Sequence, residues 1–379
     1  MKKRLLVIPF CLMFLFSMFF VSCGQQGQNQ VDTSKLEQQI SDLSKRIDDL
    51  TKKVDELSKE KAVVKVKAPV KGLKVAMVTD VGGVNDQSFN QSAWEGLKRA
   101  KSELGVEIAY KESKQDADYG PNMETFTDAN FDLIWGIGFL MGDAIKSTAQ
   151  INPDQKYAII DFAYGPETPK NVGCVVFQEE QPSFLVGYIA GKMTKTNKVG
   201  FVGGIKFPLI EKFEYGFMAG VKLANPDCEV LRQYAESFTD AAKGKAIANN
   251  MYQQNADIVF HASGGVGDGV IEAAKEKGKW AIGVDKDQNF LAPDNVLTSA
   301  MKRVDNAIFG MVKKLTEDAF VGGEMVVYNL SNDGVGIAPS SNKHVPQSIL
   351  DEVDGLIAKV KKGAIVVPAT NDAYNAFIK

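Results

Sequence analysis

The stretch TDVGGVNDQSFN at residues 79–90 concentrates the residue types that can carry chemistry. It follows the apolar run KVAMV and combines glycines with the carboxylates Asp80 and Asp86, the amide Asn90 and the ring of Phe89. Glycine, Asp and Asn also build ordinary turns, so composition alone assigns no role. A phosphate loop, a metal site and one wall of a pocket for an uncharged molecule would all use such a stretch.

Two of these kinds of site conflict with the rest of the sequence. A phosphate loop needs glycine amides at a helix N-terminus with Lys and Ser or Thr, and the chain has no G-x-x-x-x-G-K-[ST]. Asp80 and Asp86 would also repel a phosphate. The Asp and Asn spacing is not that of an EF-hand loop, and His261 and His344, the only histidines, lie far apart. We therefore expect no metal and no cofactor.

The elements that must position these residues follow an alternating pattern. From Leu73 onward, short apolar runs alternate with longer amphipathic stretches, which predicts parallel sheets with crossover helices. The predicted strands are KVAMV, VEIAY, FDLIWGI, YAIID and CVVF, then, after a break at 179–182, KVGFVG, EVLRQYA, ADIVFH, WAIGV and NVLTSA. Helices are predicted at 90–104, 183–193, 213–223, 241–253, 268–277 and 348–361, with a short strand at VVYNL. The order predicts an α/β fold of two doubly wound lobes.

Polar residues collect where the predicted strands end, which is where open parallel sheets bind ligands. The residues at these exits are Asp80, Gly138 and Asp161 in the first half and Gly204, Gly264, Asp285 and Lys302 in the second. A single carboxylate there is as well explained by a turn or a helix cap. Several at equivalent exits favour an uncharged ligand that donates hydrogen bonds and has a flat face for aromatic rings.

Composition limits the class of protein. With 379 residues, 45% of them hydrophobic and 24% charged, the chain is long enough for two domains of ordinary size. A formal net charge of -3 argues against a nucleic-acid binder, which would carry a basic surface. Besides Cys11 and Cys23, only Cys174 and Cys228 are present, and the sequence leaves open whether these two pair.

The N-terminus is predicted to be an export signal at 1–22. A basic start, KKR, precedes an apolar run at 5–21 and then SCG. The run is also at the lower limit for a membrane-spanning helix, so an uncleaved anchor is the alternative. The segment resembles a bacterial lipoprotein signal with its lipobox, although Phe20 stands where an aliphatic residue is usual. The resemblance implies acylation of Cys23 and lipid anchoring on the extracytoplasmic face of the cell membrane.

Between a linker at 23–30 and another at 62–72, residues 31–61 are predicted to form a coiled-coil stalk. Ile40, Ile47 and Val54 occupy heptad position a, and Leu36, Leu43, Leu50 and Leu57 occupy position d. This combination favours parallel two-stranded coils. The e and g positions offer no attractive ion pairs, so a single solvated helix acting as a spacer is the alternative. Monomer, dimer and trimer all stay open.

A series of motifs resembles the basic membrane protein family of lipoproteins, specifically its purine nucleoside receptors. The matching segments are TDVGGVNDQSFNQSAWEGL, EEQPSFLVGYIAGKMT, VGFVGGIKFPLIEKFEYGFMAGVK, SFTDAAKGKAIA, GVDKDQ and SAMKRVDNAI. The resemblance implies a type I periplasmic-binding-protein fold, in which two Rossmann-like lobes joined by three crossing strands close on a ligand. Within a solute-binding domain at 73–379, lobe 1 is expected at about 73–178 and 300–325, and lobe 2 at about 179–299 and 326–379.

The resemblance also implies the site and its ligand. Phe89 and Phe238 would sandwich a purine, although Phe207 competes for the second place. Asp80 and Asp161 would accept hydrogen bonds from the base, Asp285 would hold ribose hydroxyls, Lys302 would contact a sugar oxygen, and Gly264 would let the backbone approach. Asp86 and Asn90 would contact the ligand or brace the start of the helix.

The implied function is transport without catalysis. The protein would bind purine nucleosides such as guanosine, inosine and adenosine and deliver them to the permease of an ABC transporter. The alternatives are a binding protein or sensor for another small molecule, such as a sugar, and a nucleoside-hydrolysing enzyme, because carboxylates in a cleft can activate water.

Overall fold

The computed structural model describes residues 33–61 and 72–379. The predicted signal peptide, Cys23 and linker residues 23–30 and 62–71 lie outside these ranges. The chain divides into two units, Met1–Val66 and Lys67–Lys379. Within the described ranges, every helix is too short or too polar to cross a bilayer.

The first unit contributes one long amphipathic helix, α2 (Thr33–Lys61), which covers the described part of the predicted stalk. Four side chains of the predicted heptad seam, those of Ile40, Leu43, Ile47 and Leu50, are 58% to 62% exposed. Their spacing of three and four residues places them on one face of the helix. The apolar seam of α2 is therefore open to solvent.

The first lobe of the second unit is built on a six-stranded parallel sheet with the order β11-β5-β4-β3-β1-β2. Its strands are β1 (Lys74–Thr79), β2 (Glu107–Lys111), β3 (Leu133–Ile137), β4 (Tyr157–Ile160), β5 (Val172–Phe177) and β11 (Met325–Tyr328). Its helices are α3 (Phe89–Leu104), α4 (Tyr119–Asp128), α5 (Gly142–Ile151) and α10 (Val304–Thr316). Strand β3 is buried along its whole length, because helices cover both faces of a parallel sheet.

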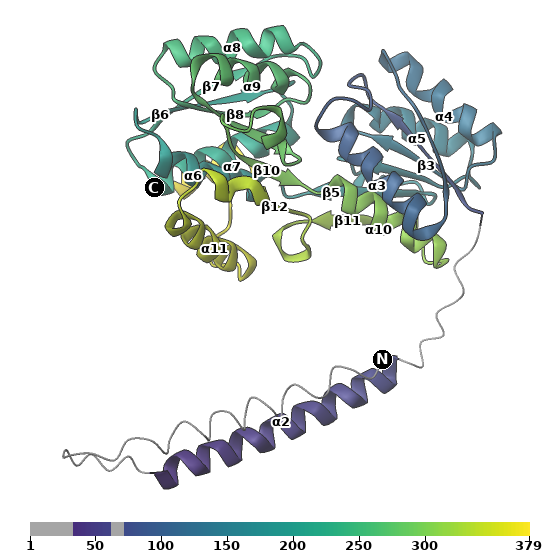
Figure 1. Ribbon diagram of the computed structural model, residues 1–379. Coiled ribbons are helices and arrows are strands. Elements are labelled where there is room, and N and C mark those ends of the chain that lie inside the picture. The colour runs from purple at the N-terminus through teal and green to yellow at the C-terminus, as the bar shows by residue number, and fades with distance from the viewer. Residues whose placement is uncertain (1–32, 62–71) are drawn as a thin grey trace. The chain divides into compact units, whose positions relative to one another are not determined.

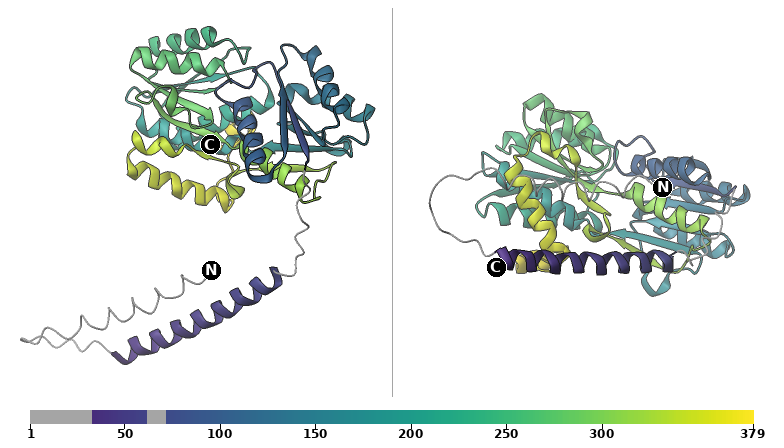
Figure 2. Two further views of the ribbon diagram at one scale, coloured as in Figure 1. Left: turned by 45° about the vertical axis from the view of Figure 1, so that its right-hand side comes forward. Right: turned by 60° about the horizontal axis from the view of Figure 1, so that its bottom comes forward.

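The second lobe repeats this plan with the strand order β12-β10-β9-β8-β6-β7. Its strands are β6 (Lys198–Gly203), β7 (Glu229–Tyr234), β8 (Ile258–Ala262), β9 (Trp280–Asp285), β10 (Val296–Lys302) and β12 (Val335–Ile337). Its helices are α6 (Glu180–Met193), α7 (Pro208–Ala224), α8 (Ala241–Gln253), α9 (Val266–Lys277), α11 (Gln347–Lys361) and α12 (Asn371–Phe377). Helix α11, yellow in both views of Figure 2, packs against α6.

Glycines let α6 and α7 approach each other closely. A Cβ atom at Gly187 would come within 2.2 Å of the carbonyl oxygen of Phe217, and one at Gly220 within 2.0 Å of that of Phe184. A side chain at either position would push the helices apart. The close contact fixes α7, whose first turns reach the space between the lobes.

The chain passes between the two lobes at three places within 72–379: from β5 to α6, from β10 to α10 and from β11 to β12. Figure 1 shows the lobes side by side, with β5, β10, β11 and β12 near their junction. The type I periplasmic-binding-protein fold with its three connections is therefore confirmed, as are the predicted strands.

Two expected lobe boundaries need correction, and one strand was missed. Residues 300–302, expected in lobe 1, belong to β10 of the second sheet. Residues 326–328, expected in lobe 2, belong to β11 of the first sheet. The chain changes lobe only after each strand ends, so the boundaries move to the strand ends. The antiparallel strand β12 was not predicted, because its three residues are too few to show a periodicity.

Candidate functional site

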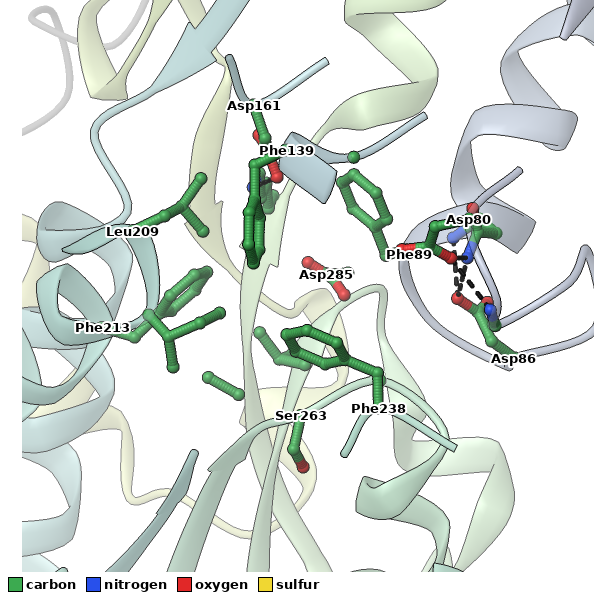
Figure 3. Close-up of a pocket in the computed structure, with 18 residues that line it drawn as sticks. Asp80, Asp86, Phe89, Phe139, Asp161, Leu209, Phe213, Phe238, Ser263 and Asp285 are labelled. Atoms are coloured by element: carbon green, nitrogen blue, oxygen red, sulfur yellow. Dashed lines mark hydrogen bonds and ion pairs between the residues drawn. The ribbon is translucent and has the colours of Figure 1, made fainter. Parts of the chain in front are cut away.

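A pocket lies between the two lobes, at the carboxyl ends of their parallel strands (Figure 3). It contains about 570 Å³ of space not filled by protein atoms, part of which is open to solvent. The nine predicted site residues, Asp80, Asp86, Phe89, Asn90, Asp161, Phe238, Gly264, Asp285 and Lys302, all line this pocket. The tertiary structure thus brings together side chains from distant parts of the sequence.

The loop that leaves β1 forms one wall and is held by its own carboxylates. Asp80 Oδ1 accepts hydrogen bonds from the Gly82 amide at 2.9 Å and from Asn90 Nδ2 at 2.8 Å. Burial raises the pKa of Asp80 to about 6, although these two hydrogen bonds favour its charged form. The side chain of Asp80 therefore ties the loop to the first turn of α3.

Asp86 braces the start of α3. Its Oδ1 accepts from the amides of Ser88 and Gln91, each at 3.0 Å, and its Oδ2 accepts from Asn90 N at 2.8 Å and Nδ2 at 3.1 Å. These bonds satisfy backbone donors that a helix N-terminus otherwise leaves free. Although Asp86 lines the pocket, the expectation that it is a ligand contact is weakened, because both its oxygens already have partners.

A buried ion network forms the floor of the pocket. Lys302 Nζ, at the end of β10, lies 2.5 Å from Asp161 Oδ2, at the end of β4, and 3.1 Å from Glu179 Oε1. Lys212 Nζ approaches the other oxygen of Glu179 at 3.0 Å. Burial raises the pKa of Asp161 to about 6, against the effect of Lys302. Burial disfavours the charged form of Lys302, but Asp161, Glu179 and Asp285 together raise its pKa.

Asp285 joins the two lobes from the end of β9. Its Oδ2 accepts a hydrogen bond from Ser88 Oγ of the first lobe at 2.5 Å. Burial raises the pKa of Asp285 to about 7. Asp161 and Asp285 also share a left-handed backbone conformation, with φ of 70° and 63°. Non-glycine residues rarely adopt it, and such strain is concentrated at functional sites.

Two acceptor atoms in the pocket lack a hydrogen-bond donor. Among the residues that the structure describes, none donates to Asp161 Oδ1 or Asn90 Oδ1, and both atoms are buried. Buried polar atoms are normally paired, because an unpaired one costs about 1–3 kcal/mol. The pocket therefore suits a ligand that supplies N–H or O–H groups.

Aromatic rings surround these polar atoms (Figure 3). Phe89 and Phe238 line the pocket as predicted, and so do Phe139 and Phe213. Phe207, considered as a competitor of Phe238, is not among the lining residues; it is 36% exposed and stacks on Phe139 with ring centroids 4.2 Å apart. Phe207 therefore lies behind the ring of Phe139 as seen from the pocket.

Phe139, Phe213 and Glu179 are among the residues of this region that sequence reasoning missed. Phe139 follows Gly138 directly at the end of β3, so the strand-exit rule applied to it. Phe213 lies within α7, where nothing in the sequence distinguishes it from a core residue. Glu179 was assigned only to a break between lobes, yet it is fully buried beside Lys302.

Among the described residues, this site shows no arrangement for thiol, metal or imidazole chemistry. Cys174 and Cys228 are free and buried. In residues 33–61 and 72–379, no group of three or more His, Cys, Asp or Glu side chains is arranged to hold a metal ion. His261 is buried and bonds to Gln288 Oε1 at 2.9 Å, and burial lowers its pKa to about 4.

Comparison with known proteins agrees with the fold. The Bmp family model, described as ABC transporter substrate-binding protein PnrA-like, matches residues 73–371. Basic membrane protein A of Borreliella burgdorferi is 41% identical over 310 residues, covering 81% of this chain and 91% of the relative. A Lactococcus lactis protein named ABC transporter nucleoside-binding protein BmpA is 38% identical over 322 residues, covering 78% of this chain and 89% of the relative.

The solved structures include a similar protein. An ABC transporter solute-binding protein from Aeropyrum pernix has a TM-score of 0.71 and 29% identity, covering 80% of this chain and 96% of that one. Two lobes, a pocket at their strand ends and relatives matched over most of their length lead to one assignment. The chain belongs to the Bmp family of PnrA-like ABC transporter substrate-binding proteins.

Proposed function

We propose that this protein binds purine nucleosides, such as guanosine, inosine and adenosine, between its lobes and delivers them to an ABC transporter permease. The observation that carries the proposal is the combination of aromatic faces with buried acceptor oxygens that lack donors. Phe89 and Phe238 offer ring faces on which a flat base can stack, while Asp161 Oδ1 and Asn90 Oδ1 can accept hydrogen bonds from N–H or O–H groups of a ligand. The relative from Lactococcus lactis that is named for nucleoside binding supports the same ligand class.

The charges of the pocket favour the nucleoside over its phosphorylated forms. The charged lining residues are Asp80, Asp86, Asp161, Asp285 and Lys302. The single ammonium, Lys302, is already paired with Asp161 and with Glu179 behind it. A phosphate would therefore meet carboxylates without a free cation to balance it.

Asp285 is assigned to the ribose. It is buried, and Ser88 Oγ donates to only one of its oxygens. The other oxygen can accept from a ribose hydroxyl, and a hydrogen bond to a charged group contributes about 1.5–3 kcal/mol. Asp80 and Asp161 face the base in this assignment, Lys302 a sugar oxygen, and Gly264 leaves room for the backbone beside the ligand.

The cellular setting follows from the family and the N-terminus. ABC transporter substrate-binding proteins capture their ligands outside the cytoplasm and are not enzymes, and we propose the same for this chain. We further propose that cleavage before Cys23 and acylation of that residue anchor the protein to the cell membrane.

Calorimetry with guanosine, guanine and guanosine monophosphate tests the ligand. We expect the nucleoside to bind more tightly than the monophosphate. Asp285→Asn should weaken guanosine binding roughly ten- to a hundredfold and guanine binding much less. The matched control is Asp294→Asn, which changes an exposed carboxylate of the same lobe. Tighter binding of the monophosphate, or equal losses for guanosine and guanine, would contradict the proposal.

A further inference from the structure

Helix α2 carries a stripe of exposed apolar side chains. Ile40, Leu43, Ile47 and Leu50 form one continuous seam, and each is 58% to 62% exposed. The residues between them are polar or charged. Removing exposed apolar surface of this kind from water lowers the free energy of the system. The seam is therefore an interaction surface, and the partner that covers it must present an equally narrow apolar stripe.

We propose that α2 pairs with α2 of a second copy of this chain as a parallel, two-stranded coiled coil. The seam is complementary to itself, because in a parallel pair each a residue meets the same a residue and each d residue the same d residue. Position a holds the β-branched residues Ile40 and Ile47, and position d holds Leu43 and Leu50. This distribution favours two strands over three or four.

The charged residues beside the seam decide the direction of the pair. Arg46 and Lys53 both occupy position g. In a parallel pair, Arg46 lies beside Thr51 of the second copy, at position e, and meets no like charge. In the antiparallel pair that keeps these seam residues in contact, Ile40 lies opposite Leu50 and Leu43 opposite Ile47, so Arg46 faces Arg46 of the second copy and like charges meet. The parallel arrangement is therefore favoured, because it avoids this contact between like charges.

The parallel direction also agrees with the proposed anchor. Both N-terminal ends of a parallel pair point the same way, so both Cys23 residues can enter one membrane. Confinement to a membrane raises the effective concentration of the two helices, which favours pairing of a coil this short. Each assembly would then carry two solute-binding units, whether or not their ligand is a nucleoside.

Disulfide cross-linking of the full chain in the membrane tests the pairing. We expect Leu50→Cys to give a cross-linked dimer under mild oxidation, because equivalent d positions of a parallel pair lie close enough for a disulfide. Lys45→Cys, on the opposite face at position f, is the matched control and should stay uncross-linked. The parent chain measures the background from its own cysteines. In the antiparallel arrangement the two Leu50 positions lie about 15 Å apart along the helix axis, so that arrangement predicts no product.

A second measurement determines the number of strands. Sedimentation of the detergent-extracted chain should give the mass of two copies, and the double variant Leu43→Asp/Leu50→Asp should halve it without changing ligand affinity. A parent mass of one or three copies would overturn the proposal, as would equal cross-linking of Leu50→Cys and Lys45→Cys. A fall in ligand affinity of the double variant would show that the seam instead serves the solute-binding unit.

Discussion

The two lobes meet through ion pairs both at the floor of the pocket and at its rim, and the surroundings of these pairs differ. At the floor, Lys302 and Asp161 are 2.5 Å apart with side chains only 2% and 5% exposed. At the rim, Lys286 Nζ lies 2.7 Å from Glu95 Oε1, but these side chains are 17% and 40% exposed. A buried charge that loses its partner is costly, whereas an exposed pair contributes little. Ion pairs with similar N···O distances can therefore contribute very different free energies, depending on how far they are buried.

This difference assigns separate tasks to the two contacts. The floor lies beside the connections between the lobes, where Lys302 ends β10 and Glu179 follows β5. Breaking this contact would leave buried charges without partners, which is costly. The rim pair can exchange its partners for water at small cost, which is what an opening pocket requires. Ligand-driven closure should therefore depend on the pocket residues between these two contacts.

The largest expected effect concerns the floor. Lys302→Met keeps the aliphatic stem but leaves Asp161 and Glu179 buried beside each other without their shared cation. We expect the free energy of unfolding to fall by about 3–5 kcal/mol in urea titrations without ligand. The matched variant Lys286→Met should change it by no more than about 1 kcal/mol. Equal losses in the two variants would contradict the distinction between floor and rim.

An intermediate effect is expected for the pH dependence of stability. Burial raises the pKa of Asp285 to about 7 and that of Asp80 and Asp161 to about 6, against an ordinary value of 3.8. The folded state therefore binds these protons more tightly than the unfolded state does. Their contribution to stability is greatest at acidic pH and is lost as pH rises toward 7.

Asp285→Asn isolates one of these carboxylates. The variant should match the parent near pH 3, where Asp285 is protonated in both the folded and the unfolded state, and exceed it at pH 8 by on the order of 1–3 kcal/mol, in thermal unfolding without ligand. Asp294→Asn serves again as the exposed control. If Asp285→Asn were less stable than the parent at pH 8, its hydrogen bond with Ser88 would outweigh the cost of burying the charge.

The smallest effect is expected at the rim. Lys286→Ala removes contacts at 2.7 Å with both Gln91 and Glu95 of the first lobe. Because exposed ion pairs contribute about 0–1 kcal/mol, nucleoside affinity should fall less than about fivefold, and less still at high salt. Calorimetry at low and at high salt measures the loss of affinity under each condition, with the exposed Lys277→Ala as the control. A loss as large as that of Asp285→Asn would make the rim a principal determinant of closure.

Much of the pocket was accessible from the sequence because its residues follow buried strands. Asp80, Asp161 and Asp285 each come at the end of an apolar run, and in a parallel sheet such ends meet at one edge. Phe89 and Asn90 belong to the same motif as Asp80. Their meeting in one pocket is observed, whereas their contact with a ligand stays a prediction.

The sequence by itself determined the alternation of strands and helices, the two lobes and the heptad seam, because hydrophobic periodicity is local and records which face of each element is buried. Only the tertiary structure decided that Asp86 braces a helix, that Phe207 lies behind Phe139, and that Lys302 pairs with Asp161 and Glu179. These roles depend on distances between residues far apart in the chain. Local patterns do not encode such distances, and TDVGGVNDQSFN becomes a pocket wall only because the tertiary structure places residues of the second lobe opposite it.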